Sequence, residues 1–170
     1  ANGFTLIRKN IGWRESGNEP FLSMLLKPTK IYVNDIKKLS AITKERIDPT
    51  TGAILIDPTT GMPKRETIKI KGLAHITGNG FDNIKRILPA RTVIKYDDSF
   101  LYENDYPAHA DMFRWIQENE GLTMEQMYAT FNCGIGMVLI VSPEDAEILE
   151  KPIINAQYVK DNIFRMGTVN

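Results

Sequence analysis

Residues 72–89 read GLAHITGNGFDNIKRILP, and this stretch decides the fold that we expect. Its strand-like run at 73–77 favours a short β-strand. The glycines of Gly78-Asn79-Gly80 break this strand, and the apolar spacing over 81–88 predicts a helix that Pro89 ends. The sequence therefore predicts a strand that delivers a glycine-rich turn to the start of a helix.

A turn of this kind suits an anion. It exposes backbone N–H groups, and the positive end of the helix dipole adds to them, so a phosphate or a carboxylate is one expected occupant. A tight connection between strand and helix without any ligand is the alternative. Two glycines separated by one residue do not distinguish an anion-binding turn from a connection without a ligand.

A second stretch that could form part of a functional site lies at residues 127–137, which read MYATFNCGIGM and connect a predicted helix to a strand. Asn132 has several hydrogen-bonding groups, and Gly134 and Gly136 allow a ligand or another backbone to approach closely. We expect Cys133 to be a small buried hydrophobe rather than a nucleophile, because no His or Lys beside it in the sequence lowers its pKa.

The remaining elements mix helices and strands without strict alternation, which favours an α+β fold with a mostly antiparallel sheet. We expect helices that begin near Asn2, Asn34, Pro107, Thr123 and Ser142, with Met112, Trp115 and Ile116 pointing inward. We expect further strands at 25–33, 67–71, 92–96, 136–141, 157–160 and 163–169. The unbroken apolar run at 137–141 is typical of a central strand that is covered on both faces.

Residues 45–66 contain the pentapeptide Asp-Pro-Thr-Thr-Gly twice, at 48–52 and 57–61. Each copy can form a tight turn, because Pro fixes φ and Gly accepts a positive φ. Two copies are too few for a solenoid. We expect a surface insertion here rather than a binding site.

Composition and charge narrow the class of protein. The chain has 170 residues, of which 42% are hydrophobic and 25% charged, so it can bury one core. Its net charge is zero, although residues 1–96 hold 17 basic and 8 acidic side chains and residues 97–170 hold 4 and 13. The balance argues against nucleic acid or an anionic membrane as the partner. No apolar run approaches the roughly 20 residues that cross a bilayer.

Metal binding is not expected. His75 and His109 lack cysteine partners and metal-ligand spacing, and the acidic segment 97–125 lacks the pattern of a calcium loop. We expect His75 to be a hydrogen-bonded core residue, His109 an exposed helix residue, and the acidic segment a solvated face. A single cysteine suits the reducing cytoplasm, and a chain that begins at Ala1 is expected to be a fragment of a longer protein.

Taken together, three segments closely resemble the C-terminal domain of the aminoimidazole ribonucleotide synthetases, also called phosphoribosylformylglycinamidine cyclo-ligases. They are residues 26–33 (LKPTKIYV), 72–89 and 127–137. Residues 2–8 and 164–169 are also similar to the start and the end of that domain, so the resemblance spans nearly all of residues 1–170. It implies a three-layer α/β/α domain with a mostly antiparallel mixed sheet.

The resemblance also implies a function. Enzymes of this family use ATP to convert formylglycinamidine ribonucleotide to aminoimidazole ribonucleotide in purine biosynthesis. ATP phosphorylates the formyl oxygen, and the amidine nitrogen then attacks that carbon. An N-terminal domain, absent from this chain, is expected to supply the catalytic groups, most ATP and magnesium contacts, and the homodimer interface. The fragment alone is expected to be inactive.

For this half of the enzyme we expect substrate-binding residues at the two glycine-rich stretches. They are Thr77, Gly78, Asn79, Gly80, Phe81, Asn83 and Asn132. Arg86 is a weaker candidate and is expected to be a surface ion-pair partner. The sequence departs from the family pattern at Asn79 (usually Gly), Lys85 (usually Pro), Gln126 (usually Glu) and Ala129 (usually Arg). Since Asn tolerates positive φ, the turn is expected to survive its substitution.

Two alternatives remain. The first is the matching domain of a relative, namely formylglycinamidine ribonucleotide synthetase, selenophosphate synthetase or the hydrogenase maturation dehydratase. The second is a non-catalytic module of the same fold, which the substitutions at Asn79 and Ala129 leave open. The run at 127–137 favours the cyclo-ligase.

Overall fold

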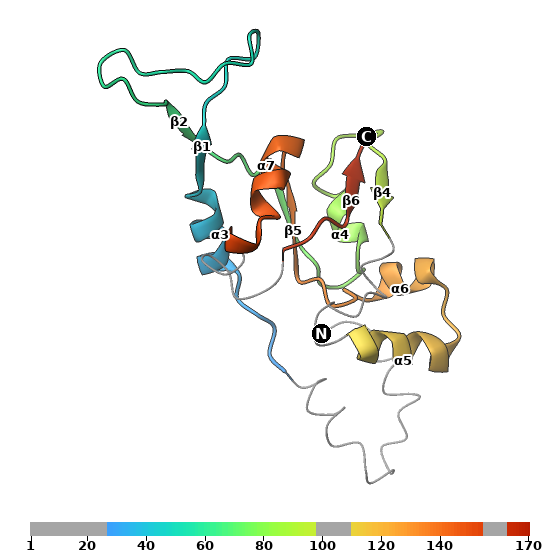
Figure 1. The fold of residues 1–170 in the computed structure, drawn as a ribbon. Helices are drawn as coiled ribbons and strands as arrows, with labels where there is room; N and C mark the ends of the chain where they lie inside the picture. The colour runs from blue at the N-terminus through green and yellow to red at the C-terminus, as the bar shows by residue number, and fades with distance from the viewer. Residues whose placement is uncertain (1–26, 98–109, 155–162) are drawn as a thin grey trace. The chain divides into compact units, whose positions relative to one another are not determined.

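The computed structural model describes residues 27–97, 110–154 and 163–170 (Figure 1). The chain divides into two compact units. Within the described ranges, the first contains residues 27–30, 72–97, 110–140 and 164–170, and the second contains residues 31–71, 141–154 and 163. The expected helix near Asn2, the expected strand at 157–160 and His109 lie outside the described residues. The start expected at Pro107 also lies outside them, but the helix expected to follow it is present over Ala110–Glu120.

The first unit contains two antiparallel strand pairs. Strand β3 (Gly72–His75) pairs with β5 (Met137–Ile140), and β4 (Ile94–Tyr96) pairs with β6 (Gly167–Val169). The helices of this unit are α4 (Asp82–Lys85), α5 (Ala110–Glu120) and α6 (Met124–Thr130). The mixture of helices with antiparallel strands is that of an α+β domain, as the sequence predicted.

A single apolar core fills the first unit. Its buried members are Ala74, Ile76, Phe81, Ile84, Phe113, Ile116, Met127, Phe131, Cys133, Ile135 and Val138. They come from both sides of the glycine-rich turn, from α5 and from the segment 127–138. Trp115 was expected to point inward, but it is exposed, because the buried face of α5 is occupied by Phe113 and Ile116.

Helix α4 is shorter than the expected span 81–88. After Lys85 the chain continues to coil, but the amides of Ile87 and Leu88 donate to carbonyls three residues back, at Ile84 and Lys85. Such bonds make a tighter 3₁₀-type turn that does not propagate far. The α-helix therefore ends well before Pro89.

Helix α6 begins where the sequence predicted, at Thr123. The Thr123 side chain accepts from the backbone N–H of Gln126, and the Gln126 side chain accepts from the N–H of Thr123. This reciprocal capping box satisfies two amides that a helix start leaves without partners.

The second unit contains α3 (Val33–Ser40), β1 (Thr43–Glu45), β2 (Arg65–Thr67) and α7 (Pro143–Leu149). Strands β1 and β2 pair antiparallel. Helix α7 starts as expected, with Ser142 as its N-cap. Within the described residues 27–33 the expected strand is absent, and the expected cap at Asn34 was wrong. The amide of Ile36 bonds to the carbonyl of Tyr32, so the helix already begins at Val33.

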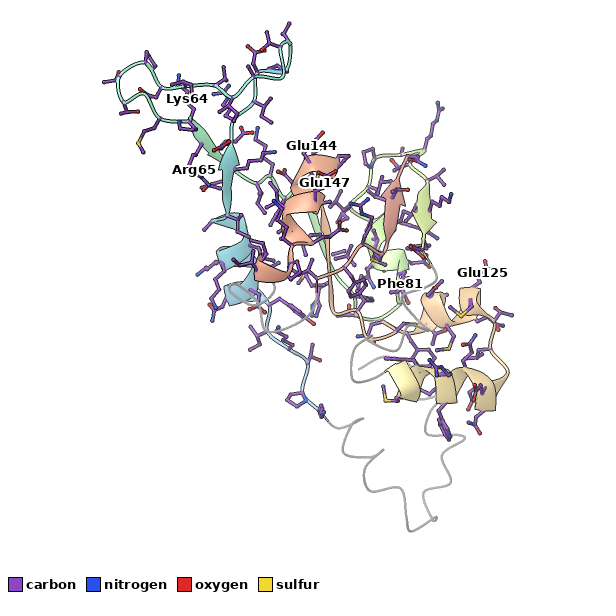
Figure 2. The ribbon with its side chains drawn as sticks, in the orientation of Figure 1. Lys64, Arg65, Phe81, Glu125, Glu144 and Glu147 are labelled. Carbon is purple, nitrogen blue, oxygen red and sulfur yellow. The ribbon has the colours of Figure 1, made fainter. Side chains whose placement is uncertain are left out.

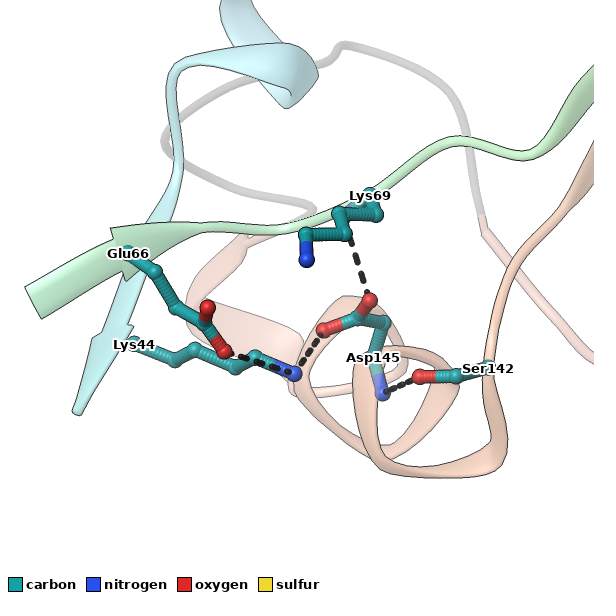
Figure 3. Close-up of polar contacts among 5 residues, drawn as sticks. All are labelled: Lys44, Glu66, Lys69, Ser142 and Asp145. Atoms are coloured by element: carbon teal, nitrogen blue, oxygen red, sulfur yellow. Dashed lines mark hydrogen bonds and ion pairs between the residues drawn. The ribbon is translucent and has the colours of Figure 1, made fainter. Parts of the chain in front are cut away.

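Asp145 on α7 connects to β1 and to the chain after β2 (Figure 3). Its side chain is 2% exposed, and Oδ1 lies 2.6 Å from Nζ of Lys44 on β1. Oδ2 accepts from the backbone N–H of Lys69 at 3.1 Å. Burial alone raises the pKa of Asp145. The hydrogen bonds from Lys44 and Lys69 lower it by more than burial raises it, so the pKa lies below its ordinary value.

Between β1 and β2, residues 46–64 form an arm, and Figure 2 shows Lys64 and Arg65 where it joins β2. Both repeats form the predicted tight turns. The carboxylates of Asp48 and Asp57 each accept two backbone N–H groups, and Gly52 and Gly61 have φ of 71° and 69°. Nearly every side chain of the arm is exposed, Ile47 and Ile56 among them.

No helix of the described ranges is both long and apolar enough to span a lipid bilayer.

Candidate functional site

The glycine-rich turn lies directly against the 127–137 segment, about fifty residues further along the chain. The N–H of Ile76 donates to the carbonyl of Gly136 at 2.9 Å, and the N–H of Phe81 donates to the carbonyl of Tyr128 at 2.7 Å. Gly80 lies at this contact. A Cβ at Gly80 would lie 2.1 Å from the Tyr128 oxygen, so only glycine fits. The structure thus brings together the two stretches singled out in the sequence.

The turn uses the left-handed backbone region twice. Asn79 has φ of 68° and Gly80 has φ of 51°, which confirms that Asn79 can occupy its position. The buried side chain of Asn83 fixes this geometry, because Nδ2 donates to the carbonyls of Gly78 and Gly80, both at 2.7 Å. The side-chain amide of Asn83 therefore stabilises the conformation of the turn.

Uncovered donors remain on the outer side of the turn. Thr77, Gly78 and Asn79 are exposed, and within the described part of the chain no acceptor is bonded to the N–H of Gly78 or of Asn79. Two adjacent amides held in a fixed turn can bind a phosphate or carboxylate oxygen. The expected help from a helix dipole is small, because α4 has only four residues and carries Asp82 in its first turn.

Asn132 is half-buried beside this turn. Its Oδ1 accepts from the N–H of Gly134 at 3.4 Å, while Nδ2 has no acceptor among the described residues. The preceding residue, Phe131, has its carbonyl 2.7 Å from the position of a Cβ on Gly80. Asn132 thus follows a residue that touches the turn, and among the described residues its Nδ2 is a further N–H donor without an acceptor.

Aromatic rings support the turn from the core. Phe81 is 2% exposed, and its ring stacks on Tyr128 with centroids 4.8 Å apart. The ring of Tyr96 lies 5.6 Å from Phe81 and 5.7 Å from Tyr128. Burial raises the pKa of Tyr96, which keeps its phenol neutral. Phe81 therefore anchors the turn, and its ring does not form part of the surface.

The sequence also matches a known protein family over most of its length. A family model described as "AIR synthase related protein, C-terminal domain" matches residues 1–157. The chain belongs to this family. The resemblance inferred from the glycine-rich stretches is thereby confirmed.

Three relatives of this AIR synthase C-terminal domain share the name phosphoribosylformylglycinamidine cyclo-ligase. The protein of Chromobacterium violaceum is 30% identical over 177 residues, that of Methylobacillus flagellatus 34% over 176, and that of Neisseria meningitidis 30% over 177. Each alignment covers 99% of this chain but only 41% or 42% of the relative. The chain spans about two fifths of the length of the curated relatives it matches.

In this AIR synthase domain, the cysteine and histidine expectations have different outcomes. Cys133 is 1% exposed, and burial raises the pKa of its thiol to about 12, so the expected buried hydrophobe is confirmed. His75 was expected in the core but is exposed, because it alternates along β3 with the buried Ala74. The residues that the structure describes contain no group of three His, Cys, Asp or Glu side chains able to hold a metal ion.

One charged pair beside the turn was missed by sequence reasoning. Nζ of Lys85 lies 2.7 Å from Oδ1 of Asp82, and this hydrogen bond raises the pKa of Lys85. Opposite charges three residues apart on a predicted helix were the signal that could have found it. Arg86 is exposed as expected, but among the described residues it has no acidic partner.

Proposed function

We propose that this chain is the C-terminal part of a phosphoribosylformylglycinamidine cyclo-ligase, which uses ATP to convert formylglycinamidine ribonucleotide to aminoimidazole ribonucleotide in purine biosynthesis. Similarity to relatives of that name over 99% of the chain supports this assignment. The structural observation that carries it is the contact between the turn at 77–80 and the segment at 128–132, which leaves two adjacent amides uncovered.

In this proposal the turn binds the anionic part of the ribonucleotide. The amides of Gly78 and Asn79 and the side chains of Thr77 and Asn132 donate hydrogen bonds to it. The other three predicted residues hold this arrangement from behind: Gly80, Phe81 and Asn83. Donors fixed before the ligand arrives need no reorganisation on binding, which favours both affinity and catalysis.

The other functions of the proposed enzyme belong, in this proposal, to a longer protein of which this chain is a part. We propose that its N-terminal part contributes the catalytic groups, most contacts to ATP and magnesium, and a homodimer interface, and that the whole enzyme is cytoplasmic. ATP supplies the phosphoryl group that makes the formyl oxygen a leaving group. We also propose that the α+β elements described above form part of a three-layer domain. The described residues give magnesium no cluster of ligands.

The test uses the full-length protein with ATP and formylglycinamidine ribonucleotide, and measures release of phosphate and formation of aminoimidazole ribonucleotide. Asn132→Ala is expected to lower kcat/KM about tenfold, the equivalent of about 1.4 kcal/mol, without changing the melting temperature. Thr59→Ala, on the exposed arm, is the control and should leave the kinetics unchanged.

Two outcomes contradict parts of this proposal. If the wild-type enzyme makes no aminoimidazole ribonucleotide, the cyclo-ligase assignment is wrong, and a related synthetase, dehydratase or non-catalytic module takes its place. If the wild type is active but Asn132→Ala has unchanged kinetics, the function stands and Asn132 is not a substrate ligand.

A further inference from the structure

Lys85 is the one basic residue of α4, and its side chain forms an ion pair within this helix. Nζ of Lys85 lies 2.7 Å from Oδ1 of Asp82, and both side chains are more than half exposed. Glu125 and the phenol of Tyr96 are also close enough to influence the charge of Lys85. Figure 2 shows Phe81 beside α4 and Glu125 on α6. The carboxylate that Lys85 contacts directly is therefore that of Asp82.

The Asp82 carboxylate lies close to the proposed anion site. Asp82 follows the turn directly, and its own N–H donates to the carbonyl of Asn79 at 3.1 Å. The turn offers only neutral donors, so an anion bound there is repelled by Asp82 unless the charge of that carboxylate is compensated. The exposed position of the pair leaves this repulsion partly screened by salt.

We propose that Lys85 is a positioning residue that compensates the charge of Asp82 and thereby allows the turn at 77–80 to hold the anionic part of the substrate. This inference rests on the proposed function. Lys85 acts through the Asp82 carboxylate and makes no contact with the reacting atoms.

A structural role for the pair and the proposed role make different predictions. An exposed ion pair three residues apart contributes little to folding stability. Under the proposal, removal of Lys85 therefore leaves the melting temperature unchanged and makes the electrostatic potential at the turn more negative. The two roles separate in the KM for the ribonucleotide and in its dependence on salt.

The experiment compares Lys85→Met, Lys85→Arg and Lys95→Met in the full-length enzyme. Lys95 is the matched control, because it is exposed on β4 and alternates away from Tyr96. At low salt, Lys85→Met is expected to raise the KM for formylglycinamidine ribonucleotide about fivefold with kcat little changed. The increase should shrink at about 0.5 M salt, where charges are strongly screened. Lys85→Arg and Lys95→Met should keep the wild-type KM.

A rescue variant makes the charge argument decisive. Lys85→Met combined with Asp82→Asn is expected to return the KM to within about twofold of the wild type, because the uncompensated carboxylate is gone. If the double variant keeps the high KM, if Lys95→Met raises it equally, or if the KM of Lys85→Met is unchanged in an active enzyme, the inference is wrong. A wild type that forms no product contradicts the proposed function instead.

Discussion

At the scale of single residues, the site depends on Gly80. Its φ of 51° is one that L side chains rarely adopt, and a Cβ would also lie 2.1 Å from the carbonyl oxygen of Tyr128 and 2.7 Å from that of Phe131. Both neighbours are backbone atoms, which cannot move aside as a flexible side chain can. Gly80 therefore permits the contact between the two stretches that make up the site.

Gly80→Ala is accordingly expected to lower the free energy of unfolding by about 3 kcal/mol or more, measured by urea denaturation. Gly61→Ala is the control. Gly61 has φ of 69° but nothing within 4 Å of its Cβ position, so it should lose only about 1 kcal/mol from backbone strain. Equal losses in the two variants would mean that the contact with Tyr128 contributes nothing.

Asn83→Ala tests whether the turn needs its internal hydrogen bonds. The substitution removes the Nδ2 donor from the carbonyls of Gly78 and Gly80 in a buried position, so we expect a loss of about 2 kcal/mol. Asn83→Asp should be no better, since a carboxylate cannot donate to either carbonyl. A stable Asn83→Asp protein would contradict this role.

Cys133 should be chemically inert in the folded protein. Only the thiolate reacts with iodoacetamide, and the pKa of about 12 keeps Cys133 protonated at all pH values well below 12. Mass spectrometry at pH 8 should detect no alkylation of Cys133 in the native chain and rapid alkylation in urea. Modification of the native protein at the rate of an exposed thiol would show that the site is open to solvent.

At the scale of elements, the second unit contains a buried charge beside a small set of buried apolar residues. Its buried apolar residues in the described ranges are Leu39, Ile42, Ile68, Leu149 and Ile154. Asp145 connects α7 to β1 through Lys44 and to the chain after β2 through the N–H of Lys69. A buried carboxylate with such partners is costly to leave unpaired.

This gives Asp145 a measurable pH dependence. Because its folded pKa is lowered, its contribution to stability is fully present above the ordinary value near 4 and is lost as the pH falls through the folded pKa. Asp145→Asn should lower the free energy of unfolding by about 2 kcal/mol at pH 7, and this difference from the wild type should shrink below pH 4. Glu147→Gln, exposed on the same helix, is the control. A difference that is constant from pH 7 to pH 3 would contradict the charge-based role.

At the scale of the whole molecule, the arm is the part that the folded units need least. Strands β1 and β2 already pair through Thr43↔Thr67 and Glu45↔Arg65, and the arm continues from their ends. Its two repeats are held by their own turns, with Asp48 and Asp57 each accepting from the Thr amides that follow.

Replacement of residues 47–63 by Asn-Gly, a two-residue hairpin turn, should therefore leave the melting temperature within about 3 °C of the wild type. The kinetics of the full-length enzyme should also be unchanged, because the arm holds none of the proposed site residues. A large loss of stability in calorimetry would show that the exposed side chains of the arm make contacts that the fold requires.

The sequence by itself determined the local features of this protein: the turns at Asp48 and Asp57, the helix starts at Thr123 and Ser142, the α+β class and the family. These follow from Pro and Gly dihedral preferences, side-chain caps and apolar spacing, which act over a few residues. Only the tertiary structure decided that the Gly80 turn packs on Tyr128, that Asn83 holds the turn, and that Asp145 pairs with Lys44. The contacts of Gly80 and Asp145 join residues that are distant in the chain, so no local pattern predicts them. The bonds of Asn83 depend on the shape of the turn, which many different sequences can adopt. The same reason explains the errors at Val33, His75 and Trp115, where hydrogen bonding and packing overrode local preference.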